Sequence, residues 1–240
     1  MAGPSLENLD VLILAGGLGK RLRKVVYDKP KPMADIAGRP FLDLLVEYTS
    51  NFGLNRFVLA TAYKSESVRA HYQKMDGPRQ ILFSNEDEPL GTAGAVKNTQ
   101  NLIRSDPFIV MNGDSFCPVD LNTFFDFHIG KNALASIVLV PAGSNQDFGV
   151  VEMNDSCQVV GFEEKKIQKQ KTFISAGIYL FQRDIFSFIP AQTACSLEYD
   201  ILPRIVGPKF YGFVTDAELV DIGTPERYYK AVKILSPAKV

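Results

Sequence analysis

One short apolar segment near the N-terminus constrains the fold more than any other feature of the sequence. Residues 9–15 are rich in valine, leucine and isoleucine and run directly into Gly16 and Gly17. A brief apolar run that ends in glycines is typical of a buried strand followed by a glycine loop. We therefore expect a buried strand here that leads directly into the glycine loop.

The segments that follow predict an alternation of strands and helices. After the first strand, the pattern predicts strands at residues 56–61, 80–84 and 108–111. Between them it predicts helices that begin near Pro40 and cover about residues 65–75 and 93–103. Strands that alternate with helices imply a doubly wound, Rossmann-like sheet, in which ligands bind beyond the carboxyl ends of the strands.

The second half of the chain is richer in strands. Strands are predicted at residues 136–140, 149–153, 158–163 and 175–181, and a helix at 183–188. No internal repeat, low-complexity tract or long linker divides the chain. We therefore expect one mixed α/β domain over residues 1–240, with a Rossmann-like half at about 1–115 and a β-rich half at about 116–240.

Composition and charge narrow the classes of function. The chain has 240 residues, 46% of them hydrophobic, and a formal net charge of −1. Nucleic acid is not an expected partner, because binding to its phosphate backbone needs a clear basic excess. No apolar run is long enough to cross a bilayer and no signal peptide is evident, so we expect a cytoplasmic protein without membrane contact. The three separated cysteines predict neither a disulfide framework nor a zinc site.

Residues 14–22, which read LAGGLGKRL, form the first candidate binding motif. Glycines let backbone N–H groups approach an anion closely, and Arg21 can bind phosphate oxygens in a bidentate manner. The order of residues differs from that of a P-loop, and Leu22 stands where a dinucleotide fingerprint requires its third glycine. Alone, the motif fits triphosphate binding and a plain strand–loop connection equally well.

Residues 29–33, which read KPKPM, form the second motif. Alternating prolines hold such a segment extended, without helical or ladder hydrogen bonds. A stiff segment fixes the direction of Lys31, as a catalytic cation requires. The same residues on their own also fit an exposed basic turn.

Together the two motifs resemble the signature of the sugar-phosphate nucleotidyltransferases, a GGxGTRL-type loop with a PKP-type lysine soon after. Five more segments follow in the order that this family shows, namely EDEPLGTAG at 86–94, NGD at 112–114, EEK at 163–165, SAGIY at 175–179 and DIGTP at 221–225. The likeness covers nearly the whole chain. It implies the nucleotide-diphospho-sugar transferase type of fold, with a nucleotide-binding first half and a sugar-phosphate-binding second half. It also implies that a nucleoside triphosphate and a sugar 1-phosphate react to give a nucleotide sugar and pyrophosphate.

The resemblance implies roles for individual residues. Nucleotide binding is expected of Leu14, Ala15, Gly16, Gly17, Gly19, Lys20, Arg21, Glu86, Pro89, Gly91, Thr92, Asn112 and Gly113. Sugar-phosphate binding is expected of Gly149, Glu164, Lys165, Ser175, Ala176 and Gly177. Asp114 and Asp221 would hold Mg²⁺, a hard ion that prefers carboxylate, water and phosphate oxygens. Arg21 and Lys31 are the expected catalytic residues, Arg21 at the triphosphate end and Lys31 at the α-phosphate.

Base preference is predicted from Glu86, since the residue three before the proline of this motif usually reads the base in the family. A carboxylate accepts hydrogen bonds but cannot donate them, so it suits the adjacent N1–H and N2–H₂ donors of guanine. GTP is therefore favoured. If Glu86 pointed to solvent, the backbone alone would read the base. Gly91 is expected to let the base pack against backbone.

The sugar is less well defined. The chain has Ser175 where the family commonly has asparagine and Lys166 where many relatives have proline. Its motifs are most similar to the short members that use D-glycero-α-D-manno-heptose 1-phosphate, with mannose 1-phosphate next and uridylyl or thymidylyl transfer to a hexose 1-phosphate after that.

Two other classes of function remain alternatives. A catalytically silent homologue that binds nucleotide sugar is disfavoured, because such relatives generally lose the signature arginine, lysine or metal aspartate. A nicotinamide-dependent dehydrogenase is disfavoured by the missing third glycine. Apolar helix faces leave a homo-oligomer possible.

Overall fold

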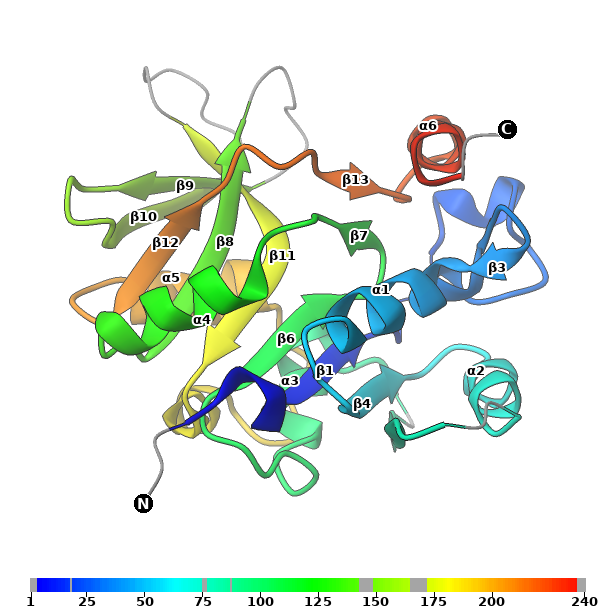
Figure 1. Cartoon of the computed structure of the whole chain (residues 1–240), viewed down its shortest axis with the longest axis horizontal. Coiled ribbons are helices and arrows are strands. Elements are labelled where there is room, and N and C mark those ends of the chain that lie inside the picture. Colours follow the sequence, from blue (N-terminus) through cyan, green and yellow to red (C-terminus); the bar gives the residue numbers. More distant parts are fainter. Residues whose placement is uncertain are drawn as a thin grey trace.

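The computed structural model describes residues 4–17, 19–74, 77–86, 88–142, 149–164 and 172–236. Its main element is a mixed sheet of nine strands. Four parallel strands form one half of this sheet, in the spatial order β5 (Gln80–Asn85), β4 (Arg56–Thr61), β1 (Asp10–Leu14) and β6 (Phe108–Asn112). The chain moves outward from β1 to β4 and β5, then returns to the other side of β1 as β6 (Figure 1). The strand order therefore reverses between β1 and β6, and ligands of such sheets bind beyond the carboxyl ends at this reversal.

An antiparallel strand, β11 (Phe173–Phe181), connects the two halves of the sheet. It pairs with β6 on one side and with β8 (Ala135–Pro141) on the other, and β8 pairs in parallel with β12 (Phe210–Val214). The beginning of β11 also pairs with β9 (Gly149–Met153), which pairs with β10 (Val159–Glu164). Two short pairs lie outside the sheet, β2 (Asp35–Ile36) with β3 (Arg39–Pro40) and β7 (Ser115–Phe116) with β13 (Val220–Asp221).

Helices cover both faces of the sheet. Alternate residues of β1 enter two different cores, with Val11 and Ile13 in one and Leu12 in the other. The first core also receives side chains from α1 (Phe41–Ser50), α2 (Ser65–Tyr72), α4 (Leu121–Gly130) and α6 (Pro225–Leu235). The second receives them from α3 (Gly91–Asn98), the 3₁₀ helix η4 (Arg183–Phe188), the π-helix η5 (Leu197–Ile201) and α5 (Leu202–Ile205). The doubly wound, mixed sheet predicted from the sequence is thus confirmed.

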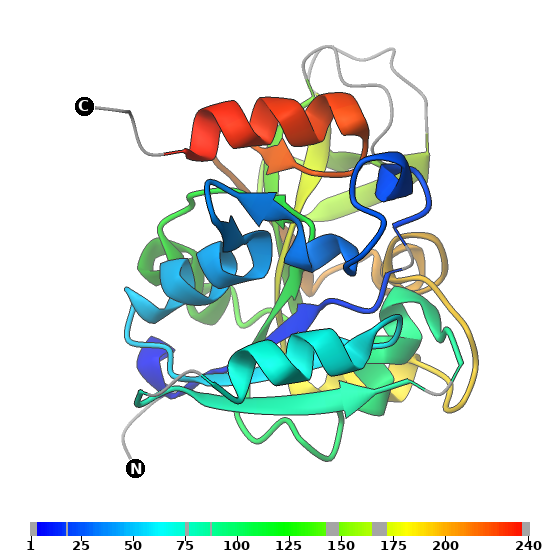
Figure 2. The same ribbon diagram turned by 90° about the vertical axis from the view of Figure 1, so that its right-hand side faces the viewer.

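The last helix, α6, packs beside the β2–β3 hairpin, which follows the KPKPM motif. Figure 2 shows α6 (red) along the upper edge, above the β2–β3 hairpin (blue). The Tyr228 hydroxyl of α6 donates to the Asp35 carbonyl of that hairpin at 2.8 Å. This contact joins the end of the chain to the segment that follows the KPKPM motif. Among the described residues, no helix has the length and apolar character that a membrane span requires.

Several predicted elements differ from the structure. The helix expected at 93–103 begins earlier and ends at Asn98, where the Thr99 hydroxyl bonds back to the Val96 carbonyl at 2.7 Å. The KPKPM segment, expected to be extended, is extended at Pro30 but then forms the 3₁₀ turn η3 (Lys31–Met33). The Met33 amide donates to the Pro30 carbonyl at 2.8 Å, so the prolines frame a turn and do not prevent one.

Several elements were not predicted, among them α4, β12 and α6. Both helices begin with a capping side chain, since Asp120 accepts from the Asn122 amide at 3.0 Å and Thr224 accepts from the Arg227 amide at 3.3 Å. These are ordinary helix-start signals, and Pro225 at the first position of α6 is another.

Candidate functional site

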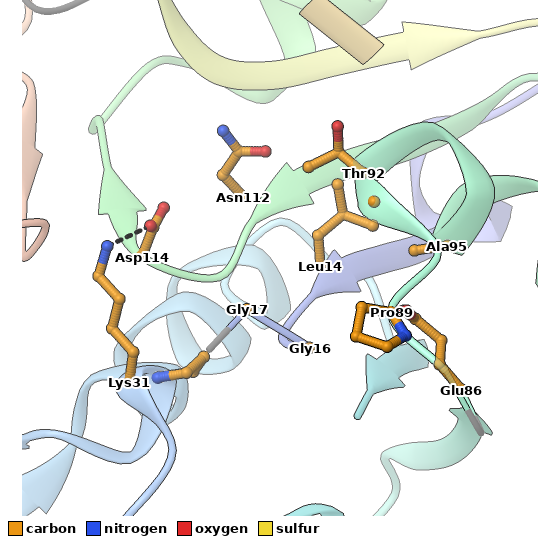
Figure 3. Close-up of a pocket in the computed structure, with 12 residues that line it drawn as sticks. Leu14, Gly16, Gly17, Lys31, Glu86, Pro89, Thr92, Ala95, Asn112 and Asp114 are labelled. Atoms are coloured by element: carbon orange, nitrogen blue, oxygen red, sulfur yellow. Dashed lines mark hydrogen bonds and ion pairs between the residues drawn. The ribbon is translucent and has the colours of Figure 1, made fainter. Parts of the chain in front are cut away.

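Two adjoining cavities lie beyond the carboxyl ends of β1 and β6. The first cavity, of about 360 Å³ and shown in Figure 3, is lined by Leu14, Gly16, Gly17, Lys31, Pro32, Glu86, Pro89, Gly91, Thr92, Ala95, Asn112 and Asp114. The second cavity, of about 190 Å³, is lined by Arg21, Lys31, Asn112, Asp114, Ser115, Phe162, Ser175, Gly177, Glu198, Leu219, Asp221, Gly223 and Arg227. Three residues, Lys31, Asn112 and Asp114, line both cavities. Most of the residues predicted for nucleotide binding thus meet in the first cavity, and Ser175 and Gly177 lie in the second.

Lys31 lies where the cavities meet. Its ammonium group ion-pairs with the Asp114 carboxylate, and the side chains of the two are 11% and 40% exposed (Figure 3). The stem of Lys31 passes beside the glycine loop, since a Cβ on Gly19 would lie 3.0 Å from the Lys31 Cβ. The 3₁₀ turn η3 and the glycine loop therefore direct this cation together.

The two aspartates predicted to hold metal lie at a pair of short strands, with Asp221 in β13 and Asp114 immediately before β7. Asp221 of β13 lies opposite Ser115 of β7, and the Ile222 amide donates to the Asp114 carbonyl at 3.0 Å. The Asp221 Oδ1 accepts from the Gly223 amide at 2.8 Å and from the Arg227 Nη1 at 3.4 Å. Each carboxylate thus faces a cation, Lys31 for Asp114 and Arg227 for Asp221.

Arg21 reaches the same place from the end of the glycine loop. A Cβ on Gly223 would lie 3.7 Å from both the Arg21 Nη2 and the Lys31 Nζ. Arg21 lines the second cavity and not the first. Within the described part of the chain, no hydrogen bond or ion pair occupies its guanidinium. Its donors are therefore available to an anionic ligand.

Glu86 is half-buried and lines the first cavity. Its Oε2 accepts from the Leu90 amide at 2.9 Å, and its Oε1 lies toward the loop, 3.2 Å from where a Cβ on Gly16 would stand. Burial raises the pKa of the Glu86 carboxyl, and the hydrogen bond from Leu90 offsets part of this effect. One carboxylate oxygen therefore holds the turn before α3, and the other is available to ligand donors.

The backbone conformation at Gly91 and the nearby Cys195 backbone require a glycine at this position. At Gly91 φ is +69°, and an added Cβ would overlap the Cys195 carbonyl oxygen, so only glycine fits. Close by, the Thr92 hydroxyl accepts from the Leu197 amide at 2.8 Å. The start of α3 is thus docked against η5, while the Gly91 backbone still lines the first cavity.

Four residues predicted for nucleotide binding support or flank the cavities without lining them. The Ala15 amide donates to the Ala60 carbonyl at 2.8 Å, and the Gly113 amide donates to the Leu14 carbonyl at 3.0 Å. These bonds fix the ends of β1 and β6 relative to their neighbours. Gly19 packs on Lys31, and Lys20 is exposed.

A distortion of β11 shapes the second cavity. The pairing of β11 with β8 shifts register between Ser175 and Tyr179. Gly177 lies in this stretch with φ +73°, and a Cβ there would be 2.8 Å from both the Asn112 Nδ2 and the Ser115 Oγ. The Ser175 hydroxyl accepts from the Gly177 amide at 3.0 Å. Ala176, also predicted for sugar-phosphate binding, contributes its carbonyl to the Ser115 hydroxyl at 3.3 Å.

Glu198 is a cavity residue that the sequence analysis missed. Its Oε1 accepts from the Tyr179 hydroxyl at 3.3 Å and its Oε2 from the Thr92 hydroxyl at 3.3 Å. Burial and the nearby Glu198 charge raise the pKa of Tyr179 well above its ordinary value, so this hydroxyl remains a donor. Glu198 stands outside every motif, and only the docking of η5 on α3 brings it to the site. Arg227 was missed as well, although it follows the DIGTP motif closely.

Three predicted sugar-phosphate residues are described only in part. Gly149 and Glu164 pair with each other across the β9–β10 hairpin, and only their backbone is described. Lys165 lies outside the described residues. Their predicted contacts with the sugar phosphate stay predictions.

The residues present fit a divalent cation that shares its coordination with a substrate. No group of three or more histidine, cysteine, aspartate or glutamate side chains that could enclose a metal occurs within the described ranges. Asp221 of β13 and Asp114, which immediately precedes β7, supply two carboxylates close together. Mg²⁺ is commonly bound by one or two carboxylates together with substrate phosphates and water.

Comparison with known proteins gives a consistent result. The family model described as nucleotidyl transferase matches residues 10–236. D-glycero-alpha-D-manno-heptose 1-phosphate guanylyltransferase of Aneurinibacillus thermoaerophilus is 37% identical over 228 residues, which are 95% of this chain and 98% of that protein. Mannose-1-phosphate guanylyltransferase of Mycobacterium tuberculosis is 34% identical over 230 residues, which are 93% of this chain but only 64% of that protein. The crystal structure of HddC from Yersinia pseudotuberculosis complexed with GMP-PN superposes with a TM-score of 0.82 at 37% identity, over 95% of this chain and all (100%) of that one.

Proposed function

Because this chain belongs to the nucleotidyl transferase family, we propose that it transfers a guanylyl group from GTP to a sugar 1-phosphate and releases pyrophosphate. The observation that carries this proposal is the pair of adjoining cavities with Lys31, Asn112 and Asp114 in common. Two cavities that share one polar boundary suit two substrates whose phosphates must meet. D-glycero-α-D-manno-heptose 1-phosphate is the favoured acceptor, in line with the activity named for the relative from Aneurinibacillus thermoaerophilus.

GTP would bind in the first cavity. Glu86 lines this cavity, and its Oε1, near Gly16, would accept hydrogen bonds from the N1–H and N2–H₂ groups of guanine. The backbone of Gly16, Gly17 and Gly91 would pack against the base and the ribose. The solved complex of HddC with GMP-PN and the guanylyltransferase names of the relatives support this choice of base.

The sugar 1-phosphate would bind in the second cavity. Ser175 and Glu198 place hydroxyl and carboxylate groups there, which suit the hydroxyls of a sugar ring. Gly149, Glu164, Lys165 and Ala176 remain proposed contacts of this substrate. Mannose 1-phosphate is the second candidate acceptor, because the Mycobacterium tuberculosis relative is named for it.

In the proposed reaction, an oxygen of the sugar phosphate attacks the α-phosphorus of GTP in line, and the bond to the leaving pyrophosphate breaks. Lys31 would move from Asp114 to the α-phosphate and stabilise its charge in the transition state, while Arg21 would hold the triphosphate end. No nucleophilic side chain is needed. Asp114 and Asp221 would hold Mg²⁺, which supplies charge neutralisation between the phosphates when bound.

The proposal is tested by pyrophosphate release from purified protein with Mg²⁺. GTP, CTP, UTP, dTTP and ATP are each combined with a panel of sugar 1-phosphates that includes the heptose and mannose compounds. Release with GTP and one sugar supports the proposal and identifies the acceptor. Release only with UTP or dTTP would refute the role of Glu86, and no release from any pair would refute the activity.

A further inference from the structure

A row of hydrogen-bonded side chains lies behind the wall of the second cavity. The Ser175 and Tyr179 hydroxyls are 3.1 Å apart, and the Tyr179 hydroxyl donates to the Glu198 Oε1 at 3.3 Å. The Ser175 hydroxyl oxygen also accepts from the Gly177 amide at 3.0 Å. Ser175 and Glu198 line the cavity, whereas Tyr179 is fully buried and lines neither cavity. Tyr179 thus joins two residues of the cavity wall from behind.

The directions of the hydrogen bonds in this row are fixed by its two ends. The Glu198 carboxylate only accepts, so the Tyr179 hydroxyl must donate to it. Burial and the nearby Glu198 charge raise the pKa of Tyr179 well above its ordinary value, so the phenol keeps this hydrogen. With its hydrogen directed to Glu198, the Tyr179 oxygen can only accept from Ser175. At the other end, the Gly177 amide donates to the Ser175 oxygen, which leaves the serine hydrogen for Tyr179.

This direction determines what the two wall residues offer to a ligand. The single hydroxyl hydrogen of Ser175 points to Tyr179, so its oxygen can only accept from the cavity. The Glu198 Oε2 already accepts from the Thr92 and Ser196 hydroxyls, at 3.3 and 3.2 Å, and its Oε1 keeps a lone pair beyond the bond from Tyr179. Because Ser175 and Glu198 bond the same Tyr179 oxygen, they lie close together on the wall. They therefore offer a ligand two neighbouring acceptors and no donor.

A pair of acceptors decides which end of a sugar 1-phosphate can bind beside it. Phosphate oxygens are acceptors, so they would leave Ser175 and Glu198 unpaired, whereas sugar hydroxyls can donate to both. The donors that a phosphate needs lie elsewhere on the wall, where the Arg21 Nη2 and the Lys31 Nζ are both near Gly223. The sugar ring thus fits beside Ser175 and Glu198, with its phosphate toward Arg21 and Lys31.

We infer that Ser175 and Glu198 select the acceptor substrate by sugar hydroxyls that donate hydrogen bonds, and that Tyr179 is the positioning residue that fixes this selectivity. The inference rests on the proposed function, since it specifies the sugar that the second cavity takes. A sugar whose hydroxyl is removed or replaced by fluorine at these contacts leaves a wall acceptor unpaired. A sugar with an ammonium group there still donates and is accepted.

The test measures binding of acceptor analogues by calorimetry, with Mg²⁺ and a GTP analogue whose α,β-bridging oxygen is replaced by a methylene group. The parent acceptors are D-glycero-α-D-manno-heptose 1-phosphate and α-D-mannose 1-phosphate, and each ring hydroxyl is replaced in turn by fluorine or by an amino group. Tyr179→Phe and Ser175→Ala are compared with the wild type. Tyr211→Phe is the matched control, since the Tyr211 hydroxyl donates to the Pro208 carbonyl at 2.9 Å and Tyr211 lines neither cavity.

In the wild type, fluorine at the ring position that contacts Ser175 is expected to weaken binding about 10- to 100-fold, and the amino analogue should bind at least as tightly as the parent. In Tyr179→Phe the serine hydrogen is free to turn to the ligand. The loss caused by fluorine at this position should then shrink to about threefold or less, with an unchanged Kd for the GTP analogue. Ser175→Ala should remove the discrimination at the same ring position, and Tyr211→Phe should match the wild type.

Fluorinated analogues that bind the wild type as tightly as the parent at every ring position overturn the inference. It is equally overturned if Tyr179→Phe discriminates against fluorine as the wild type does at all positions, or if the wild type binds neither parent acceptor. Should Tyr179→Phe fail to fold, an unchanged pattern in Ser175→Ala overturns it instead. A wild type that binds an acceptor but releases no pyrophosphate from GTP overturns the proposed function, and the analogues still decide the roles of Ser175 and Tyr179.

Discussion

At the scale of single residues, the position of Lys31 decides more of the proposed chemistry than any other side chain. The 3₁₀ turn η3 and the stem contact with Gly19 direct its ammonium group to the boundary of the two cavities. Its present partner is Asp114. A cation held in this way needs little reorganisation to reach a phosphate, and such preorganised charge is a main source of catalytic rate.

Lys31→Ala is therefore expected to lower kcat by about 10²–10³, with a much smaller effect on KM, because the charge is needed mainly in the transition state. Steady-state kinetics of pyrophosphate release measure both constants. Lys29→Ala is the matched control, since Lys29 is exposed and lines neither cavity. An increase in KM with unchanged kcat would show that Lys31 only binds substrate.

Glu86 should make GTP binding depend on pH. Burial raises the pKa of its carboxyl, so as pH falls this group takes up a proton at a higher pH than an ordinary glutamate. The protonated form is a poorer acceptor for guanine, so KM for GTP is expected to rise as pH falls through this range. In Glu86→Gln the rise should be absent, and the preference for GTP over UTP should fall about tenfold. A pH profile of KM that is the same in Glu86→Gln and in the wild type would contradict base recognition by Glu86.

At the scale of elements, the site depends on the distorted stretch of β11. Gly177 adopts φ +73° so that the strand passes close to Asn112 and Ser115. The same stretch presents Ser175 to the second cavity. Strand geometry, and not only side-chain identity, thus determines where the acceptor can bind.

Gly177→Ala is expected to destabilise the protein by about 1–3 kcal/mol, because a non-glycine residue at this φ is strained and its Cβ would clash. Affinity for the sugar phosphate should fall more than affinity for GTP, since the second cavity is the one deformed. Urea unfolding and calorimetric binding measure the two effects. Gly130→Ala provides the control, because a Cβ on Gly130 at the end of α4 meets no neighbouring atom within 4 Å. Equal loss of both affinities would argue against a local effect.

The elements that could be predicted from the sequence are those whose own residues show a characteristic pattern. Residues 9–15 and the strands that alternate with helices show their apolar pattern directly, and the seven motifs in order indicated the family. Asp120 and Thr224, which cap α4 and α6, are also local helix-start signals, but neither helix was predicted from them. Glu198 could not be predicted in this way, since it reaches the cavity only through the docking of η5 on Thr92. Contacts between residues this distant in the chain leave no mark in a single sequence.

At the scale of the whole molecule, the site lies at the carboxyl ends of a sheet whose two faces are each covered by an apolar core. Helices cover both faces of the sheet, and the cavities open at the reversal of strand order between β1 and β6. The proposed metal ligands Asp114 and Asp221 belong to the short β7–β13 region and not to either core. Metal binding should therefore affect activity far more than folding.

Treatment with EDTA is expected to abolish pyrophosphate release and to leave the thermal midpoint Tm within about 2 °C of the untreated protein, because the metal site adds little to the cores. Readdition of Mg²⁺ should restore the activity. Circular dichroism follows the unfolding and a coupled assay follows the pyrophosphate. A large fall in Tm on chelation would indicate a structural metal instead.

The most direct test of two substrates meeting at Lys31 is the crystal structure of the protein with Mg²⁺ and the nucleotide sugar that it makes. The account predicts the guanine in the first cavity beside Glu86, the diphosphate at Lys31 and Asp114, and the sugar in the second cavity beside Ser175 and Glu198. A base bound in the second cavity, or a product bound outside both cavities, would contradict it.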